Sequence, residues 1–201
     1  MLMITARDYV LYDGVKVSLF YHDLNCGNAK SRTTERTVEL GIAQYWLSKY
    51  NTNLVEIGAV TPYYFSGLIK EIVDPSDKNE YVNIRKSLFD VDITGKNVLS
   101  ISTIEHIGTG DYYLHKNERD CIHALNKILK DSLACLITIP IGYNRVLDTY
   151  IQSGAVADSA CTDIYFRSKT LNNWRHTRNL TVIDKISYGP HWANGLIIIS
   201  R

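Results

Sequence analysis

Apolar side chains recur at helical spacing in two stretches of this chain, and each stretch predicts an amphipathic helix. In the first stretch, Val38, Ile42 and Tyr45 fall on one face. In the second, Leu125 and Ile128 do the same. The predicted helices are 34–50 with Thr33 or Thr34 as the cap, 118–130 with Asn117 as the cap, and 144–153 ended by Gly154.

Short apolar runs lie between and after these helices, and each run predicts a strand. One of them, Leu133–Pro140, is apolar throughout, as expected for a strand that is covered on both faces. Because strands alternate with helices, we expect an α/β fold with a Rossmann-like, doubly wound, mostly parallel seven-stranded sheet and a late antiparallel edge pair. The predicted strands are 54–57, 68–73, 81–84, 98–102, 133–140 and the late pair 163–167 and 196–200.

The length of 201 residues favours a single domain, and the chain has no repeat, long linker or low-complexity tract. Residues 1–30 differ from the rest because turn formers such as Asp13–Gly14 and Cys26–Gly27–Asn28 interrupt them. We expect a loop-rich N-terminal segment there, outside the main sheet. Its His22–Asp23 pair suits either a lid over a site or an ordinary surface pair.

Charge and cysteine content exclude several classes of function. The net charge of +1 gives no electrostatic reason for binding nucleic acid or an anionic membrane. The four cysteines form no CxxC pair, so a zinc ribbon is not expected, and they fit a reducing compartment. The first residues carry no signal-peptide pattern, and the apolar run around 133–141 is too short to span a bilayer. We therefore expect a cytoplasmic protein.

Two predicted strands end in residues that suit a nucleoside. The strand 54–57 runs into Gly58, and the strand 68–73 runs into Asp74. Ligands bind at the carboxyl ends of strands in such sheets, where a glycine permits close approach and a carboxylate can hold ribose hydroxyls. No GxxxxGK[ST] or GxGxxG motif is present, and Pro62 follows the single glycine. This pattern favours a cofactor without phosphates.

Several segments, in this order, resemble class I S-adenosylmethionine-dependent methyltransferases. They are Val55–Gly58, the strand end at Asp74, residues 99–107 and the helix and strand over 118–140. The resemblance implies S-adenosylmethionine as the cofactor. It places Glu56 and Gly58 at the methionine end, Asp74 at the ribose, Ser87 and Leu88 at the adenine, and Ser102 and Thr103 beside the sulfonium.

A narrower resemblance concerns the acceptor. Residues 31–39, 102–108 and 139–144 are similar to methyltransferases of glycan-assembly systems. This similarity implies transfer of a methyl group to a sugar hydroxyl, for instance of a deoxyhexose such as rhamnose. The candidates for acceptor contacts are Tyr143, Asn144, Trp174 and His191, and packing in the core is the competing explanation for the aromatic residues.

His106 is the candidate general base, because an alcohol does not ionise by itself at neutral pH. Glu105 either orients it or holds a substrate hydroxyl, unless both residues only pack in a turn. Asp148 is a weaker candidate for the base. Arg32, near Glu35, suits the cofactor carboxylate or an ion pair at the helix start. Glu105 and His106 with a distant acid form too weak a pattern to predict a Mg²⁺ site.

Three other functions compete with this interpretation. A methyltransferase for a small phenol or quinone-like compound needs a mostly apolar acceptor pocket. The single glycine at position 58 favours instead a non-catalytic module that binds the cofactor. Nucleic-acid methylation lacks a basic surface and the Asn/Asp-Pro-Pro-Tyr/Phe motif.

Overall fold

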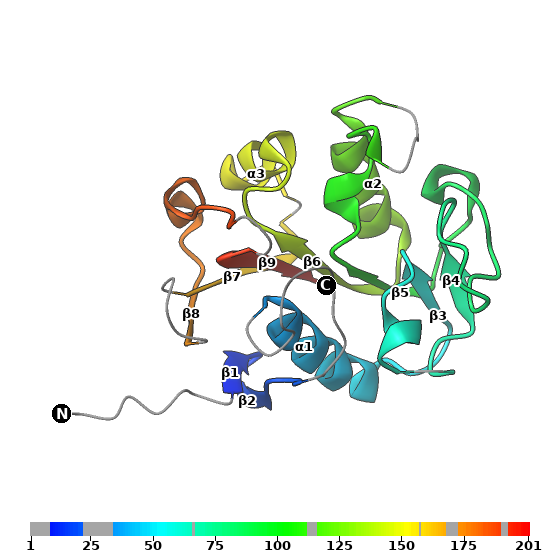
Figure 1. Cartoon of the computed structure of the whole chain (residues 1–201), viewed down its shortest axis with the longest axis horizontal. Helices are drawn as coiled ribbons and strands as arrows, with labels where there is room; N and C mark the ends of the chain where they lie inside the picture. The colour runs from blue at the N-terminus through cyan, green and yellow to red at the C-terminus, as the bar shows by residue number, and fades with distance from the viewer. Residues whose placement is uncertain are drawn as a thin grey trace.

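The computed structural model describes residues 9–21, 34–65, 67–111, 116–156, 158–167, 173–189 and 193–201. Its centre is a seven-stranded mixed sheet in the order β4-β3-β5-β6-β9-β7-β8 (Figure 1). The strands are β3 (Leu54–Ile57), β4 (Glu71–Val73), β5 (Asn97–Ile101), β6 (Ala134–Pro140), β7 (Cys161–Arg167), β8 (Trp174–Thr177) and β9 (Gly195–Ser200). The predicted α/β fold class is confirmed, with a parallel half formed by β4, β3, β5 and β6 and antiparallel pairing among the C-terminal strands.

The C-terminal half of the sheet differs from the prediction in its order. The late strands β7 and β9 are not the edge pair, because β9 lies between β6 and β7 and β8 occupies the edge. The first five residues of β9 are all buried, which is the pattern of a strand covered on both faces. The sequence of β8, Trp-Arg-His-Thr, contains no apolar run, and for this reason the pattern missed it.

Residues 81–84 also differ from the prediction, because they form an isolated bridge between Ile84 and Val73 in place of a strand. The side chain of Asn83 bonds to the outer edge of β4, where its Oδ1 accepts from the Ile72 N–H at 3.0 Å and its amide donates to the Lys70 carbonyl. The Asn83 side chain therefore occupies the edge of β4 with which a longer strand would pair.

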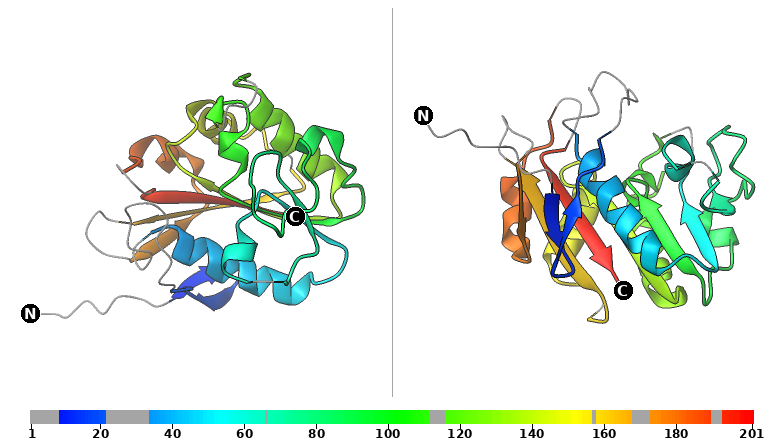
Figure 2. Two further views of the ribbon diagram at one scale, coloured as in Figure 1. Left: turned by 45° about the vertical axis from the view of Figure 1, so that its right-hand side comes forward. Right: turned by 90° about the horizontal axis from the view of Figure 1, so that it is seen from below.

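Helices cover both faces of the sheet (Figures 1 and 2). α1 (Arg36–Lys49) packs on one face, whereas α2 (Asp120–Asp131) and α3 (Arg145–Gln152) pack on the other. Alternate side chains of β5 show the division, because Val98 joins the cluster with α2 and Leu99 joins the cluster with α1. Within the described ranges, no helix combines the length and the apolar character needed to cross a bilayer.

The strands β1 (Tyr9–Tyr12) and β2 (Val15–Ser18) form a separate hairpin beside α1 (Figure 1). Its turn residues Asp13 and Gly14 have φ of 50° and 73°, as a type I′ turn requires. Gly41 permits the close contact between α1 and β2, because a Cβ at this position would lie 2.4 Å from a backbone oxygen of β2. The described residues 9–21 of this segment lie outside the main sheet as predicted, but they include a regular hairpin.

This hairpin packs as part of the core, since Val10, Tyr12 and Val17 are buried together with α1. None of its described residues lines the cavity at the carboxyl ends of the parallel strands. The His22–Asp23 pair, expected as a lid or a surface pair, lies outside the described residues.

Both predicted N-caps differ from the structure. The N-cap of α1 is Glu35 in place of Thr33 or Thr34, the N-cap of α2 is Arg119 in place of Asn117, and neither makes a side-chain capping bond. Asn144 caps α3 by accepting a backbone N–H through its side chain. This last cap matters for the site, because it fixes the loop that follows β6.

Candidate functional site

A cavity of about 710 Å³ opens at the carboxyl ends of the parallel strands. Its lining includes Gly58 after β3, Asp74 after β4, Ser102 after β5 and Pro140 at the end of β6. The chain leaves β3 for β4 on one side and returns as β5 on the other, so β3 and β5 flank the switch point where doubly wound folds bind ligands. The volume lies within the range of small-molecule sites, roughly 300–1,000 Å³.

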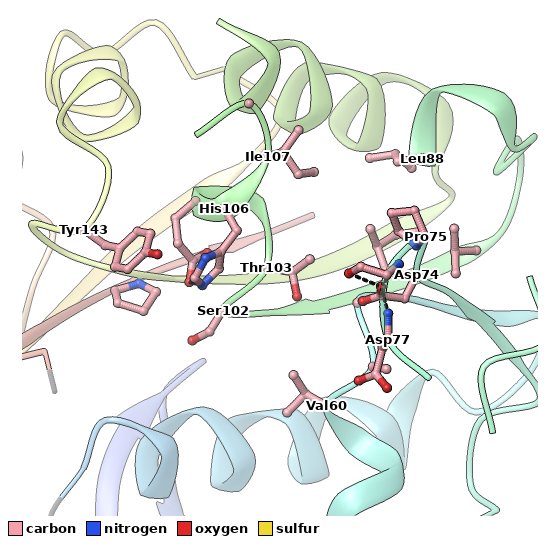
Figure 3. A pocket seen from close by; sticks show the side chains of 18 of the residues that line it. Val60, Asp74, Pro75, Asp77, Leu88, Ser102, Thr103, His106, Ile107 and Tyr143 are labelled. Atoms are coloured by element: carbon pink, nitrogen blue, oxygen red, sulfur yellow. Dashed lines mark hydrogen bonds and ion pairs between the residues drawn. The ribbon is translucent and has the colours of Figure 1, made fainter. Parts of the chain in front are cut away.

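This cavity brings together most of the predicted site residues. Figure 3 shows Asp74 and Leu88 at one end, His106 and Tyr143 at the other, and Thr103 between them. The residues expected at the ribose and beside the acceptor thus lie at opposite ends of one space. The predicted residues that line it are Gly58, Asp74, Ser87, Leu88, Ser102, Thr103, Glu105, His106 and Tyr143.

Three other predicted residues are not part of the lining, namely Glu56, Asn144 and Trp174. Trp174 lies in β8, is buried with the α1 cluster, and has the Arg167 guanidinium 5.0 Å above its ring. Asn144 is buried and donates its amide to the Glu105 carbonyl at 2.9 Å while it caps α3. Both were expected to face the acceptor, and both have structural contacts instead.

Arg32 and His191, expected at the cofactor and at the acceptor, lie outside the described residues. Asp148, the weaker candidate for the base, is buried and accepts the Gly142 N–H at 2.9 Å. It therefore supports the loop after β6 and does not face the cavity.

Glu56 supports the turn after β3 from beneath. One carboxylate oxygen accepts the N–H groups of Val60 and Thr61 at 3.0 and 2.8 Å, and the other accepts the Thr61 hydroxyl. Burial raises the pKa of Glu56 to about 7 even though these hydrogen bonds lower it. Both oxygens are engaged within the protein, so Glu56 shapes the floor of the cavity in place of the predicted cofactor contact.

Gly58 brings that turn against the end of β5. Its φ is 87°, and a Cβ at this position would lie 2.0 Å from the Thr103 Oγ1. Only glycine meets both conditions, because other residues are strained at positive φ and also need space for a side chain. The floor of the cavity is therefore bare backbone at this point.

We expect Gly58→Ala to lower the free energy of unfolding by about 2–5 kcal/mol, from strain at positive φ plus the clash with Thr103. Gly95→Ala is the matched control, because Gly95 has φ 69° with no atom within 4 Å of its Cβ position. Gly95→Ala is expected to lower the free energy of unfolding only by the backbone strain, about 1–2 kcal/mol. Urea denaturation measures both, and equal losses for the two variants would contradict the contact with Thr103.

Asp74 presents a carboxylate at the end of β4. Its Oδ1 accepts the N–H groups of Ser76 and Asp77, both at 2.8 Å, and the Ser76 hydroxyl at 3.0 Å. These bonds fix the side chain against its own turn. No hydrogen bond to Oδ2 occurs among the described residues, so this oxygen is available to a ligand in the cavity.

Ser102 has a strained backbone at the end of β5, with φ of 42°. Its hydroxyl donates to the Glu39 Oε1 at 2.5 Å, and Thr138 of β6 donates to the same oxygen at 2.7 Å. Glu39 is fully buried and pairs with Arg36 at 3.0 Å. Side chains from α1, β5 and β6 thus hold the bend that turns the following residues into the cavity.

His106 lies in the short helix η4 (Ile104–His106) and is held by an acid that the sequence pattern missed. Its Nδ1 lies 2.8 Å from the Asp111 Oδ2, and the Tyr143 hydroxyl donates to the same oxygen at 2.7 Å. Burial raises the pKa of Asp111, but hydrogen bonds from Tyr143, His106 and Thr109 outweigh it and lower the pKa. An anionic Asp111 fixes the imidazole, an arrangement typical of a general base.

Two acids, the buried Glu105 and the half-buried Glu35, lie at the His106 end of the cavity. Glu105 is 1 % exposed and Glu35 accepts the Ala193 N–H at 3.1 Å. Burial raises the pKa of Glu105 well above its ordinary value, and burial together with the charge of Glu39 raises that of Glu35 to about 7. Tyr188 completes this end, with its pKa raised to about 12 chiefly by burial. No local pattern singled out Tyr188, because it is distant along the chain from the other residues at this end.

The charged residues of the lining are mostly acidic. Arg36 carries a positive charge there, and it is paired with Glu39. The acids in the lining are Glu35, Asp74, Asp77, Glu105 and Asp120. Such a cavity favours a ligand with positive charge or many hydroxyl groups over one with phosphates. No group of three metal-ligating side chains occurs among the described residues.

Comparisons with known proteins assign no family. No protein-family profile and no curated protein matches the chain. A chain in "Structure of the Pnkp1/Rnl/Hen1 RNA repair complex" aligns with a TM-score of 0.42 and 10% sequence identity. The alignment covers 84% of this chain and 42% of the other, so this chain spans less than half the length of that protein.

Proposed function

We propose that the cavity binds S-adenosylmethionine and that the protein transfers its methyl group to a hydroxyl group of a sugar in a glycan. One observation carries the proposal. A single cavity at the switch point holds a carboxylate suited to ribose at one end, Asp74, and an Asp111–His106 pair suited to proton removal at the other.

The residues of the cavity fit this donor. The Oδ2 of Asp74 can accept ribose hydroxyls, while Ser87 and Leu88 line the same end and can contact the adenine. The bare backbone at Gly58 leaves room for the methionine part. The carboxylates of Asp74, Asp77 and Asp120 in the lining favour a positively charged sulfonium and disfavour the diphosphate of a dinucleotide.

A turn with a single glycine is compatible with this function. In the turn 58–61, Gly58 is the residue with positive φ, and the Glu56 carboxylate supplies the bonds that hold the rest. The reduced glycine content is therefore weak support for a non-catalytic module.

The chain's own residues supply acceptor activation. Asp111 holds the Nδ1–H of His106, so that Nε2 takes the proton from the acceptor hydroxyl. When bound, S-adenosylmethionine supplies an electrophilic methyl group, which passes to the acceptor oxygen as the carbon–sulfur bond breaks. Ser102 and Thr103 line the cavity between the two ends and align the reacting groups, a contribution of roughly 7–11 kcal/mol in well-oriented reactions.

A sugar fits the acceptor end better than a phenol. Tyr143 and Tyr188 form an aromatic wall with ring centroids 5.8 Å apart, and Glu35 and Glu105 add polar groups beside it. A phenol or quinone would leave the Oε2 of the buried Glu105 carboxyl group without a partner. The resemblance of residues 102–108 and 139–144 to methyltransferases of glycan-assembly systems supports the same acceptor, including a deoxyhexose such as rhamnose.

Calorimetry tests the donor first. We expect saturable binding of S-adenosylmethionine and S-adenosylhomocysteine and no binding of NAD⁺. Transfer of a labelled methyl group is then measured on a panel of methyl glycosides and phenols. Binding of NAD⁺ without S-adenosylmethionine would overturn the proposal, and label on phenols alone would replace the sugar acceptor by a phenol.

A further inference from the structure

Glu105 is a buried carboxyl group whose hydrogen bonds are incomplete. It is 1 % exposed, it lines the cavity, and its Oε2 has no hydrogen-bond partner among the described residues. A buried polar atom without a partner is costly, and native proteins usually pair such an atom with a protein group, a water molecule or a ligand. A ligand that brings a hydroxyl group into this end of the cavity would remove the cost.

Glu105 and His106 face the same end of the cavity at a fixed separation. The Nε2 of His106 lies 3.8 Å from the Oε1 of Glu105. Asp111 fixes the imidazole from its Nδ1 side, and the Asn144 amide fixes the Glu105 backbone through its carbonyl. The spacing of the two polar groups is therefore set by the protein before any acceptor binds.

This spacing matches two neighbouring hydroxyl groups. The oxygens of adjacent hydroxyls on a sugar ring are about one hydrogen-bond length apart, so each can reach one of two groups separated in this way. The ring of Tyr143 lies 4.4 Å from that of His106 and offers an aromatic face to the apolar side of the sugar. A lone hydroxyl would satisfy only one of the pair.

We propose that Glu105 and His106 together recognise a vicinal diol, and that the protein methylates one hydroxyl only when a free hydroxyl stands on the neighbouring carbon. This inference rests on the proposed sugar methyltransferase function. His106 takes the proton of the reacting hydroxyl, whose oxygen forms the new bond to the methyl carbon as the carbon–sulfur bond breaks. Glu105 hydrogen-bonds the neighbouring hydroxyl, which keeps its proton.

Protonation of Glu105 fits this role. Burial raises its pKa well above the ordinary value, and the nearby charges of Glu39 and Glu35 raise it further, whereas Arg36 lowers it. A neutral carboxyl group both donates and accepts hydrogen bonds, so it can pair with a hydroxyl without leaving a buried charge.

The test uses pairs of acceptors with the wild-type protein. The best methyl glycoside of the panel is compared with its analogues that lack, one at a time, each hydroxyl next to the methylated position. We expect one of these analogues to lose about 10- to 100-fold in kcat/KM, as for a lost hydrogen bond to a buried partner. An analogue lacking a hydroxyl elsewhere on the ring is the control for general loss of contacts.

A cycle with Glu105→Met assigns the loss to Glu105. In this variant, removal of the neighbouring hydroxyl is expected to cost much less than in the wild type, because methionine is similar in size but cannot hydrogen-bond that hydroxyl. Glu118→Met is the matched control, since Glu118 is exposed and does not line the cavity. The control should keep the full wild-type preference for the diol.

The outcomes separate this inference from the proposed function. Equal kcat/KM for the diol and for both analogues lacking a neighbouring hydroxyl, in a protein that methylates glycosides, overturns the diol inference alone. An unchanged preference in folded Glu105→Met removes Glu105 from the diol inference. Failure to bind S-adenosylmethionine or to methylate any glycoside overturns both. If Glu105→Met does not fold, the comparison of acceptors with the wild-type protein still decides whether a diol is required.

Discussion

His106→Ala is expected to lower kcat for methyl transfer by about 10²- to 10⁴-fold, the usual contribution of a positioned general base. The variant removes the imidazole that Asp111 orients at 2.8 Å, while the other end of the cavity with Asp74 is untouched. Affinity for S-adenosylmethionine should therefore stay within a few-fold of wild type. Single-turnover transfer to the best glycoside and calorimetry with the donor measure the two effects separately.

His123→Ala is the matched control for this prediction, because His123 lies on α2 with 60% of its side chain exposed. It should retain wild-type kcat. Wild-type turnover by a folded His106→Ala protein would remove His106 from proton transfer and leave Asp111 and Tyr143 as a structural cluster.

The second large effect is expected from Asp74→Asn, which should weaken binding of S-adenosylmethionine by about 10- to 100-fold. Asparagine keeps an oxygen that can accept the N–H groups of Ser76 and Asp77, so the turn after β4 should survive. The second oxygen, however, becomes an amide that donates, and it can no longer accept ribose hydroxyls. Calorimetry gives the dissociation constant, and thermal unfolding without ligand checks that the turn is intact.

Asp90→Asn provides the same chemical change at an exposed position outside the lining, and it should bind the donor as the wild type does. A dissociation constant that is unchanged in Asp74→Asn would place the ribose elsewhere and would leave Asp74 with a role only in its turn.

The sequence was sufficient for features that depend on neighbouring residues. Strand Leu54–Ile57 matches its prediction, and β6 lies within the predicted 133–140, because short apolar runs bury themselves in a sheet in the same way in many contexts. The positions of Gly58, Asp74 and His106 could also be predicted. Gly58 and Asp74 directly follow parallel strands, His106 lies in the short helix after β5, and the ends of parallel strands meet at one edge of the sheet.

Roles that depend on side-chain direction could not be predicted from the same pattern. Glu56 and Gly58 are only two residues apart, yet Glu56 bonds to the turn and Gly58 lines the cavity. Trp174 looked suited to a sugar, but the edge strand that carries it turns its ring into the core. Direction on a strand is set by register with the neighbouring strands, which a single stretch of sequence does not contain.

By itself, the sequence determined the fold class and the strand ends at which the cavity opens, because hydrophobic periodicity and turn chemistry are local properties. Only the tertiary structure decided which side chains share the acceptor end. Glu35 at the start of α1 bonds to Ala193 just before β9, and Tyr188 reaches the ring of Tyr143. These contacts join segments far apart in the chain and depend on the order β6-β9-β7, which is set by burial of β9 on both faces.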